Sequence, residues 1–434
     1  MKVEKVIYDF EEVQSKMQEL LSQNHNILIE QKNNWTTECD IPIKHYSIGS
    51  GKNHIVLFGA YHGLEIISAE FLIYSMSVIL SNLEEYKDIL ENYTLDFVPI
   101  VNPEGYIITT SAIRKVIPKE YDLLQIQQIC NEFVNCCKLD DLANTKFGLK
   151  RYQKLFENVT YNDIPDKYYK IKQKLKSLFE NFNLPNGVMI TWAANANGID
   201  LNANTKYNNH FLEIENNEEL YLSYRYSNIN YANPGPINCP WNKEKQFELE
   251  KENRIISSFL EELYIQNKLS AIFNFHSAGG IIDQRPSNIA PDLKNRNIDI
   301  KIKSIENYIL AKIYQSETYK DKKNPNNTRY DILKQGSEIG TQNGLYRTIY
   351  PMDLLIELSS TIANLLGVYS DIESDYKNTL ESNFEALIKS IRNIYKTKEI
   401  SSKIYKMVDD KNLTETDFIN SAYNLIDKII DNFK

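Results

Sequence analysis

The chain has 434 residues, of which 42% are hydrophobic and 25% are charged, and this is enough apolar material for a large folded core. The composition excludes a disordered chain, a collagen-like repeat and a small disulfide-stabilised protein. The formal net charge is −9, with acidic and basic residues interleaved. We therefore expect no nucleic acid among its partners.

The N-terminal residues carry acidic side chains where the apolar centre of an export signal would lie, and no stretch reaches about 18 apolar residues. We expect a cytoplasmic protein that has no membrane partner. The five cysteines, an odd number, indicate reduced thiols. Cys136 and Cys137 lie near Cys130, but no zinc-finger spacing follows them, so helix packing explains them better than metal binding.

The first helical pattern extends from Val3 to Leu21, and a polar segment follows it. Residues 55–60 then form a short apolar run, which is typical of a strand buried on both faces of a mainly parallel sheet. His62 and Glu65 come next, before a run of helical length. We expect both side chains at the C-terminal end of the strand, where open α/β sheets place active sites.

Three further apolar runs predict buried strands that carry or border polar residues. They are residues 94–101, 271–275 and 353–358. Helical patterns occur around residues 244–266 and 301–318. This alternation predicts an α/β fold with three α/β/α layers and a mixed, mainly parallel central sheet.

Two other segments are predicted to be helical within a single domain over residues 1–434. Residues 118–182 are rich in Lys, Glu, Tyr and Leu and predict a helical insertion. Residues 370–434 predict C-terminal helices, the last with an apolar face and with Thr414 and Thr416 as candidate caps. We expect this last helix to dock on the main body. A membrane anchor is the alternative, which the lack of a basic cluster disfavours.

His62 and Glu65 are spaced so that one turn can direct both side chains to the same ion. Taken alone this spacing is a weak signal, and a salt bridge or a helix cap would explain the pair without a metal. His276, after the run 271–275, would add a third ligand and leave a fourth position open, as in catalytic zinc sites. Glu357 lies within an apolar run, so it pairs with a buried Arg or Lys, faces solvent at the end of the sheet, or transfers protons.

Together these residues resemble the zinc metallocarboxypeptidases. Five ordered elements carry the resemblance: His62-Gly63-Leu64-Glu65, Asn102-Pro103-Glu104-Gly105-Tyr106, the run Asn195 to Asn202, His276 and Glu357. The sequence looks most similar to the bacterial branch that cleaves γ-D-glutamyl-diaminopimelate bonds of cell-wall peptides. The resemblance covers about residues 40–110 and 185–365.

The resemblance implies a role for each matching residue. His62, Glu65 and His276 would bind one Zn²⁺ per chain, which activates water and polarises the scissile carbonyl. Glu357 would take the proton of that water and return it to the leaving amine. Asn202 would bind the carboxylate of the substrate.

The sequence departs from the family pattern at Ala193 and Ala203, where basic residues usually bind the terminal carboxylate and stabilise the oxyanion. Four cations are candidates to replace them, although each is also explained as a surface residue: Lys206, Arg225, Arg285 and Arg347. Tyr346 and Tyr350 are candidates for the pocket tyrosine, or are packing residues. If Arg347 lines the pocket, an acidic substrate side chain is its natural partner.

The predicted function is a zinc-dependent metallopeptidase that hydrolyses a peptide or isopeptide bond near a free carboxyl end, with cell-wall peptides as favoured substrates. One alternative is a cytosolic N-acyl amino acid amidohydrolase that resembles desuccinylases and aspartoacylases. Another is a binding protein that retains zinc without catalysis, which Ala193 and Ala203 would favour. The sequence predicts no oligomeric state.

Overall fold

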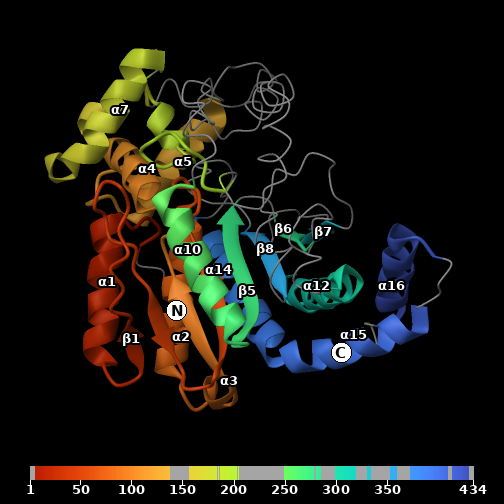
Figure 1. Cartoon of the computed structure of the whole chain (residues 1–434). Coiled ribbons are helices and arrows are strands. Elements are labelled where there is room, and N and C mark those ends of the chain that lie inside the picture. The colour runs from red at the N-terminus through yellow and green to blue at the C-terminus, as the bar shows by residue number, and fades with distance from the viewer. Residues whose placement is uncertain are drawn as a thin grey trace.

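A computed structural model describes residues 5–136, 156–182, 184, 186–202, 204, 249–277, 280–284, 299–318, 330–333, 352–358, 372–408 and 413–429. Its centre is an eight-stranded sheet in the order β1-β2-β4-β3-β5-β8-β6-β7 (Figure 1). The strands are β1 (Leu28–Glu30), β2 (Tyr46–Ile48), β3 (Asn53–Phe58), β4 (Tyr93–Val98), β5 (Leu269–Ser277), β6 (Ile281–Asp283), β7 (Asp331–Leu333) and β8 (Asp353–Leu358).

The four central strands β4, β3, β5 and β8 are parallel to their neighbours, so their C-terminal ends share one edge of the sheet. Strands β1 and β2 add antiparallel pairs on one side, and β6 pairs antiparallel with β8 on the other. The sheet is therefore mixed and mainly parallel, as predicted. The four predicted strands correspond to the four central ones, which are long enough to show an apolar pattern.

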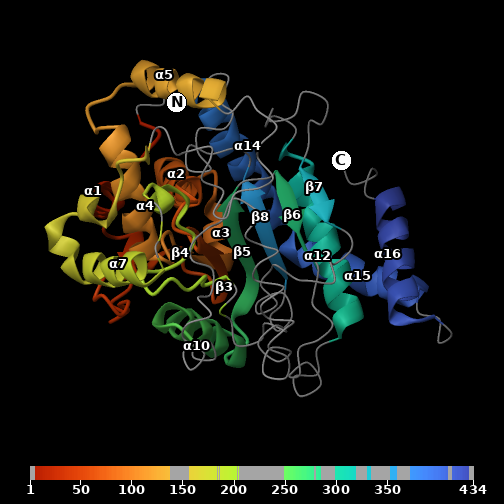
Figure 2. The same ribbon diagram turned by 90° about the horizontal axis from the view of Figure 1, so that it is seen from above.

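Helices cover both faces of the sheet (Figure 2). Their bounds are α1 (Phe10–Gln23), α2 (Ile66–Ser81), α3 (Lys87–Asn92), α4 (Pro103–Val116), α5 (Leu123–Cys136), α7 (Tyr169–Phe182), α10 (Lys251–Ile265), α12 (Ile300–Gln315), α14 (Ile372–Arg392), α15 (Ile394–Val408) and α16 (Glu415–Ile429). Short 3-10 turns span Tyr161–Asp163, Asp166–Tyr168 and Val188–Thr191.

Alternation along the strands divides the core into two layers. On β5, Phe273 and Phe275 belong to the core shared with α2 and α14, whereas Ile272 belongs to the core shared with α10. Successive side chains of a strand point to opposite faces, so this assignment places the two helical layers on opposite sides. The predicted α/β/α architecture is confirmed. His276 lies on the same face of β5 as Ile272 and therefore on the α10 side.

The N-terminal helix begins later than predicted, at Phe10 rather than near Val3. Asp9 accepts a hydrogen bond from the backbone N–H of Glu12, and the Glu12 side chain accepts one from the backbone N–H of Asp9. This capping box satisfies free N–H groups at the helix start and explains the later boundary. The polar segment that follows also contains β1 and β2, whose three residues each are too few to show a pattern.

The described part of residues 118–182 contains α5, two 3-10 turns and α7. Cys130 on α5 is buried and free, whereas Cys137 lies outside the described residues. The division of the chain into one domain with an insertion at 118–182 stays a prediction.

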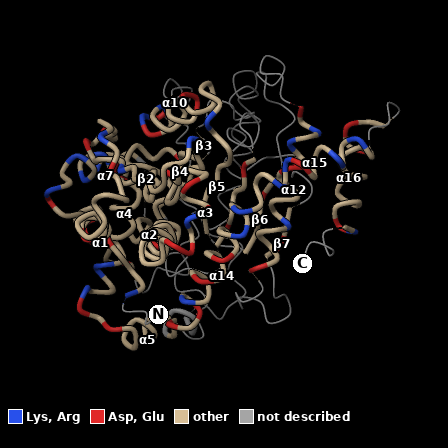
Figure 3. Tube along the Cα trace, turned by 90° about the horizontal axis from the view of Figure 1, so that it is seen from below, with Lys and Arg blue, Asp and Glu red and all other residues tan. Residues whose placement is uncertain are grey.

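The last helix, α16, packs its apolar side chains Phe418, Ala422 and Ile426 in a cluster with α12. Thr414 caps the helix by accepting a hydrogen bond from the backbone N–H of Asp417. Among the described residues, no helix has the length and hydropathy needed to span a bilayer. Basic and acidic residues are interspersed along the described chain (Figure 3).

Candidate metal centre

The turn after β3 holds the first two candidate ligands at the C-terminal edge of the sheet. Ala60 adopts a left-handed backbone conformation with φ of 46°, which is uncommon for a residue with a side chain. Its N–H donates to Ser68 Oγ at 2.8 Å, and its carbonyl accepts from Asn102 N at 3.0 Å. These bonds hold the strained turn that leads into His62.

Glu65 is the N-cap residue of α2, but its side chain makes no capping hydrogen bond. Glu65 Oε1 instead lies 2.6 Å from His62 Nδ1. Glu65 Oε2 lies 2.8 Å from Nδ1 of His276, at the end of β5. Of the two metal-free explanations of the sequence, the helix cap is therefore not observed, while the pairing of His62 with Glu65 is.

The three side chains form a buried group that fits a metal ion. One ligand atom from each of His62, Glu65 and His276 lies within 4.8 Å of the others. Their exposed fractions are 6%, 2% and 0%. A tetrahedral zinc ion with bonds of about 2.1 Å needs such atoms to be about 3.4 Å apart, which small side-chain adjustments would achieve.

His276 provides a second test of the fit. Within the described residues, neither of its ring nitrogens makes a hydrogen bond of normal geometry, although Nδ1 lies close to Glu65 Oε2. Glu65 Oε2 likewise has no hydrogen bond of normal geometry from the described part of the chain. Leaving such polar atoms buried and unsatisfied costs about 1–3 kcal/mol for each group, and a coordinated cation would remove this cost. The residues therefore fit zinc.

The electrostatic surroundings favour the protonation state that can bind a metal in two of the three residues. Burial lowers the pKa of His276, which keeps its imidazole neutral. Burial alone would raise the pKa of Glu65, but the two histidines outweigh it and lower that pKa, so the carboxylate is ionised. Burial alone would lower the pKa of His62, but the charges of Glu65 and Asp200 raise it well above its ordinary value.

Asp200 contacts the far side of His62. Its Oδ1 lies 3.2 Å from His62 Nε2 and accepts a hydrogen bond of 2.8 Å from the backbone N–H of Asn202. The run Asn195 to Asn202 contains Asp200, but the sequence did not predict its contact with His62. A carboxylate that binds the second nitrogen of a ligand histidine orients the ring. The same contact brings Asn202, which is 6% exposed, near the candidate metal centre.

The motif that begins at Asn102 packs against the turn that carries His62. A Cβ on Gly63 would lie 2.1 Å from the carbonyl carbon of Gly105, so the two backbones touch. A Cβ on Gly105 would lie 2.4 Å from the carbonyl oxygen of Ala194. These close approaches require glycine at both positions. They bind three segments, distant in sequence, into one support for the site.

Glu104 strengthens this support. It is fully buried, and its two carboxylate oxygens accept hydrogen bonds of 3.0 Å from the backbone N–H groups of Cys39 and Ala196. The sequence pointed to the motif that contains Glu104 but assigned no role to the side chain.

Glu357 lies directly opposite His276 in the register of the parallel strands β5 and β8. Residues paired in this way project from the same face of a sheet, so Glu357 shares the face of His276. Its side chain is only partly buried. Among the described residues, the strand register thus brings Glu357 next to a candidate ligand.

The other candidates for substrate binding lie outside the described residues. They are Lys206, Arg225, Arg285, Tyr346, Arg347 and Tyr350, and Ala203, one of the two departures from the family pattern, also lies outside. Ala193, by contrast, is described and is 2% exposed. Its carbonyl accepts hydrogen bonds from Gly63 N and Asn102 Nδ2, so the backbone at Ala193 helps to hold the turn that carries His62.

Residues 24–140 match the family model for zinc carboxypeptidase, and this segment includes His62, Glu65 and the motif around Gly105. A search of curated proteins gives no match. Among solved structures, carboxypeptidase A from Helicoverpa armigera is 15% identical, with a TM-score of 0.48, over 92% of this chain and 75% of that one.

Two further solved structures show a similar degree of likeness. Bovine thrombin-activatable fibrinolysis inhibitor, in complex with tick carboxypeptidase inhibitor, is 13% identical, with a TM-score of 0.45, over 90% of this chain and 97% of that one. A metallo-carboxypeptidase from Burkholderia cenocepacia is 9% identical, with a TM-score of 0.43, over 89% of this chain and 70% of that one. The family-model match and the His62, Glu65 and His276 cluster support the predicted class, a zinc carboxypeptidase-like hydrolase with zinc as its cofactor.

Proposed function

We propose that the protein is a zinc-dependent peptidase that hydrolyses a peptide or isopeptide bond near a free carboxyl end. The convergence of His62, Glu65 and His276 at the C-terminal edge of the sheet carries this proposal. Two histidine nitrogens and one carboxylate are a ligand set of catalytic zinc, which keeps a fourth position for water or substrate.

Each residue of the site has a separate task. His62, Glu65 and His276 hold the ion, and Asp200 keeps the His62 ring oriented through Nε2. When bound, zinc lowers the pKa of water and polarises the carbonyl of the substrate. Glu357 accepts the proton of the attacking water and donates it to the leaving amine, a role that its position opposite His276 supports.

The substrate has a free carboxylate, which Asn202 binds by hydrogen bonding. Arg347 and Tyr346 are proposed to complete this part of the site. Cell-wall peptides with a γ-D-glutamyl-diamino acid bond are the favoured substrates, because the motifs of the sequence are most similar to the branch that cleaves them.

The proposal is tested by comparing the native protein with Glu357→Gln. We expect about one zinc per chain in both proteins, because Glu357 is not a ligand. Loss of the proton acceptor lowers the hydrolysis rate by about 10²–10⁴-fold. Elemental analysis measures the zinc, and release of the terminal residue measures hydrolysis.

The control is Glu373→Gln, which changes an exposed glutamate at the start of α14 and keeps full activity. Full activity in Glu357→Gln would contradict the mechanism. Hydrolysis of N-acyl amino acids, without any cleavage of γ-D-glutamyl peptides, would contradict the proposed substrate. Zinc binding without turnover on either class would show a protein that binds but does not catalyse.

A further inference from the structure

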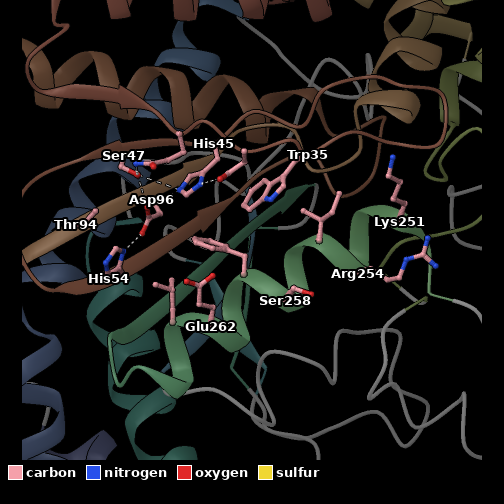
Figure 4. Close-up of a pocket in the computed structure, with 15 residues that line it drawn as sticks. Trp35, His45, Ser47, His54, Thr94, Asp96, Lys251, Arg254, Ser258 and Glu262 are labelled. Atoms are coloured by element: carbon pink, nitrogen blue, oxygen red, sulfur yellow. Dashed lines mark hydrogen bonds and ion pairs between the residues drawn. The ribbon is translucent and has the colours of Figure 1, made fainter.

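A groove of about 520 Å³ lies between α10 and the sheet face that this helix covers (Figure 4). Strands β2, β3 and β4 line one side, and α10 lines the other. None of His62, Glu65 and His276 lines it. The groove includes His54, near the start of β3, whereas His62 follows the other end of that strand. A volume of this size accommodates a small organic ligand or a short peptide.

Asp96 on β4 organises the sheet side of the groove. Its Oδ1 accepts hydrogen bonds from Ser47 Oγ at 2.7 Å and from His45 Nε2 at 2.8 Å. Its Oδ2 lies 2.6 Å from His54 Nδ1. Burial alone would raise the pKa of Asp96, but the hydrogen bonds from the two histidines lower it. The carboxylate is therefore ionised, and His54 Nδ1 is a donor.

The direction of these hydrogen bonds excludes a nucleophilic serine. Ser47 donates its proton to Asp96, and His45 Nδ1 accepts from Asn33 Nδ2 at 3.1 Å, so His45 Nε2 is protonated and cannot serve as a base. A Ser-His-Asp triad requires the opposite arrangement. The His54 side chain is 21% exposed and lines the groove, so its ring can contact a ligand there.

The two ends of the groove differ in charge. Lys251 and Arg254 lie at one end, and His54 and Glu262 lie at the other (Figure 4). Lys251 Nζ donates to Thr36 Oγ1 and to the carbonyl of Thr37. One of its three N–H groups is then left to donate to a ligand. Arg254 is exposed, and within the described chain its guanidinium makes no ion pair. The basic end therefore suits a carboxylate, and the other end suits an ammonium group.

The middle of the groove is aromatic. Trp35 stacks on His45 with ring centroids 5.3 Å apart, and Phe259 packs against both rings at 5.3 and 4.8 Å. Trp35 lies between the two charged ends (Figure 4). Aromatic walls of this kind bind apolar or aromatic side chains.

The helix sets the distance between the charged ends. Arg254 and Glu262 are eight positions apart on α10, which is about 12 Å at 1.5 Å per residue. An extended peptide advances about 3.3 Å per residue, so about four residues span this distance. A single amino acid, with both charges on one carbon atom, is too short.

We propose that this groove is a second binding site, which takes a short peptide of about four residues with free ends. Its carboxylate binds Arg254 and Lys251, its amino group donates to Glu262 at the end that also holds His54, and an apolar or aromatic side chain packs on Trp35. The site is independent of the metal centre and does not depend on the proposed hydrolysis.

The test uses the peptide Ala-Phe-Ala-Ala and isothermal titration calorimetry on the Glu357→Gln protein, which prevents hydrolysis during the measurement. We expect binding to persist after a chelator removes zinc. Arg254→Ala and Glu262→Gln each weaken the Kd about three- to tenfold. The matched controls Lys268→Ala and Glu261→Gln change residues that do not line the groove and leave the Kd unchanged.

Peptides with blocked ends test the orientation without any dependence on folding of a variant. The C-terminal amide binds more weakly and no longer responds to Arg254→Ala, and the N-acetyl peptide no longer responds to Glu262→Gln. Loss of peptide binding when the chelator removes zinc would overturn the groove proposal and leave the proposed function intact. Equal Kd values in Arg254→Ala and Lys268→Ala would do the same. Peptide binding that is sensitive to Arg254→Ala, in a protein that shows no zinc-dependent hydrolysis, would support the groove proposal and contradict the proposed function.

Discussion

His62 is held from both sides by carboxylates, and this arrangement decides which of its nitrogens faces the candidate metal centre. Nε2 contacts Asp200, so Nδ1 is directed towards Glu65 and the shared ligand position. His276 also directs Nδ1 to Glu65. At the scale of single residues, the site is therefore prepared by contacts outside the ligand set.

Replacing Asp200 tests this orientation. We expect Asp200→Ala to weaken zinc affinity about 10–100-fold, because the His62 ring loses its partner at Nε2. Asp200→Asn keeps an acceptor for Asn202 N and for the ring, so we expect a smaller loss of zinc affinity in this variant. Competition with a chromogenic chelator measures both. Equal zinc affinity in Asp200→Ala and the native protein would mean that the contact does not orient the ring.

Between elements, a buried carboxylate on α2 joins segments from the two ends of the chain. Glu70 Oε1 accepts from Tyr8 N at 2.9 Å, and Oε2 accepts from the hydroxyl of Tyr376, on α14, at 2.7 Å. Burial raises the pKa of Glu70 from 4.5 to about 8, although these hydrogen bonds oppose the shift. The packing of α14 on α2 therefore includes an acid that is mostly protonated at neutral pH.

The raised pKa of Glu70 makes stability depend on pH. Because the native state retains this proton while the unfolded state loses it near 4.5, stability falls as the pH rises from 4.5 to about 8 and then levels off. Glu70→Gln removes this contribution to the dependence of the unfolding free energy on pH. At pH 9 we expect the variant to be more stable than the native protein by an amount of the order of a few kcal/mol.

Urea unfolding at several pH values measures the effect of Glu70→Gln. The control is Glu84→Gln, which changes an exposed glutamate and keeps the native pH dependence. The same slope in Glu70→Gln and the native protein would contradict the raised pKa.

At the scale of the whole molecule, the proposed ligand set joins the two halves of the chain. His62 and Glu65 follow β3, and His276 ends β5, its neighbour in the sheet. An ion bound by all three stabilises the folded state, in which the strands are adjacent, relative to an unfolded chain in which they are apart.

Removing zinc is therefore expected to lower the midpoint of thermal unfolding. Free zinc at about 100 times its Kd contributes ~2.7 kcal/mol to the native state. Differential scanning calorimetry with and without a chelator measures the shift. His276→Ala, which lacks one ligand, responds less to the chelator than the native protein. An equal response of the two proteins would show that zinc stabilises the chain elsewhere.

The central part of the fold could be predicted because its signals are local. The strands β3, β4, β5 and β8 have six to nine residues each, and more than half of the residues in each strand are apolar. Strands of three residues, such as β6 and β7, lack enough side chains to show a period. The start of α1 was misplaced because a reciprocal capping box, rather than the apolar period, set the boundary.

The sequence by itself determined the types of side chain that end or follow the central strands: His62, Glu65, His276 and Glu357. It did so because strand periodicity and motif order are properties of neighbouring residues. Only the tertiary structure decided that Asp200 contacts His62, that Glu104 joins two distant backbones, and that Asp96 directs His54 into a groove. Those contacts join positions far apart in the chain, and their distances and directions arise only when the strands and helices pack.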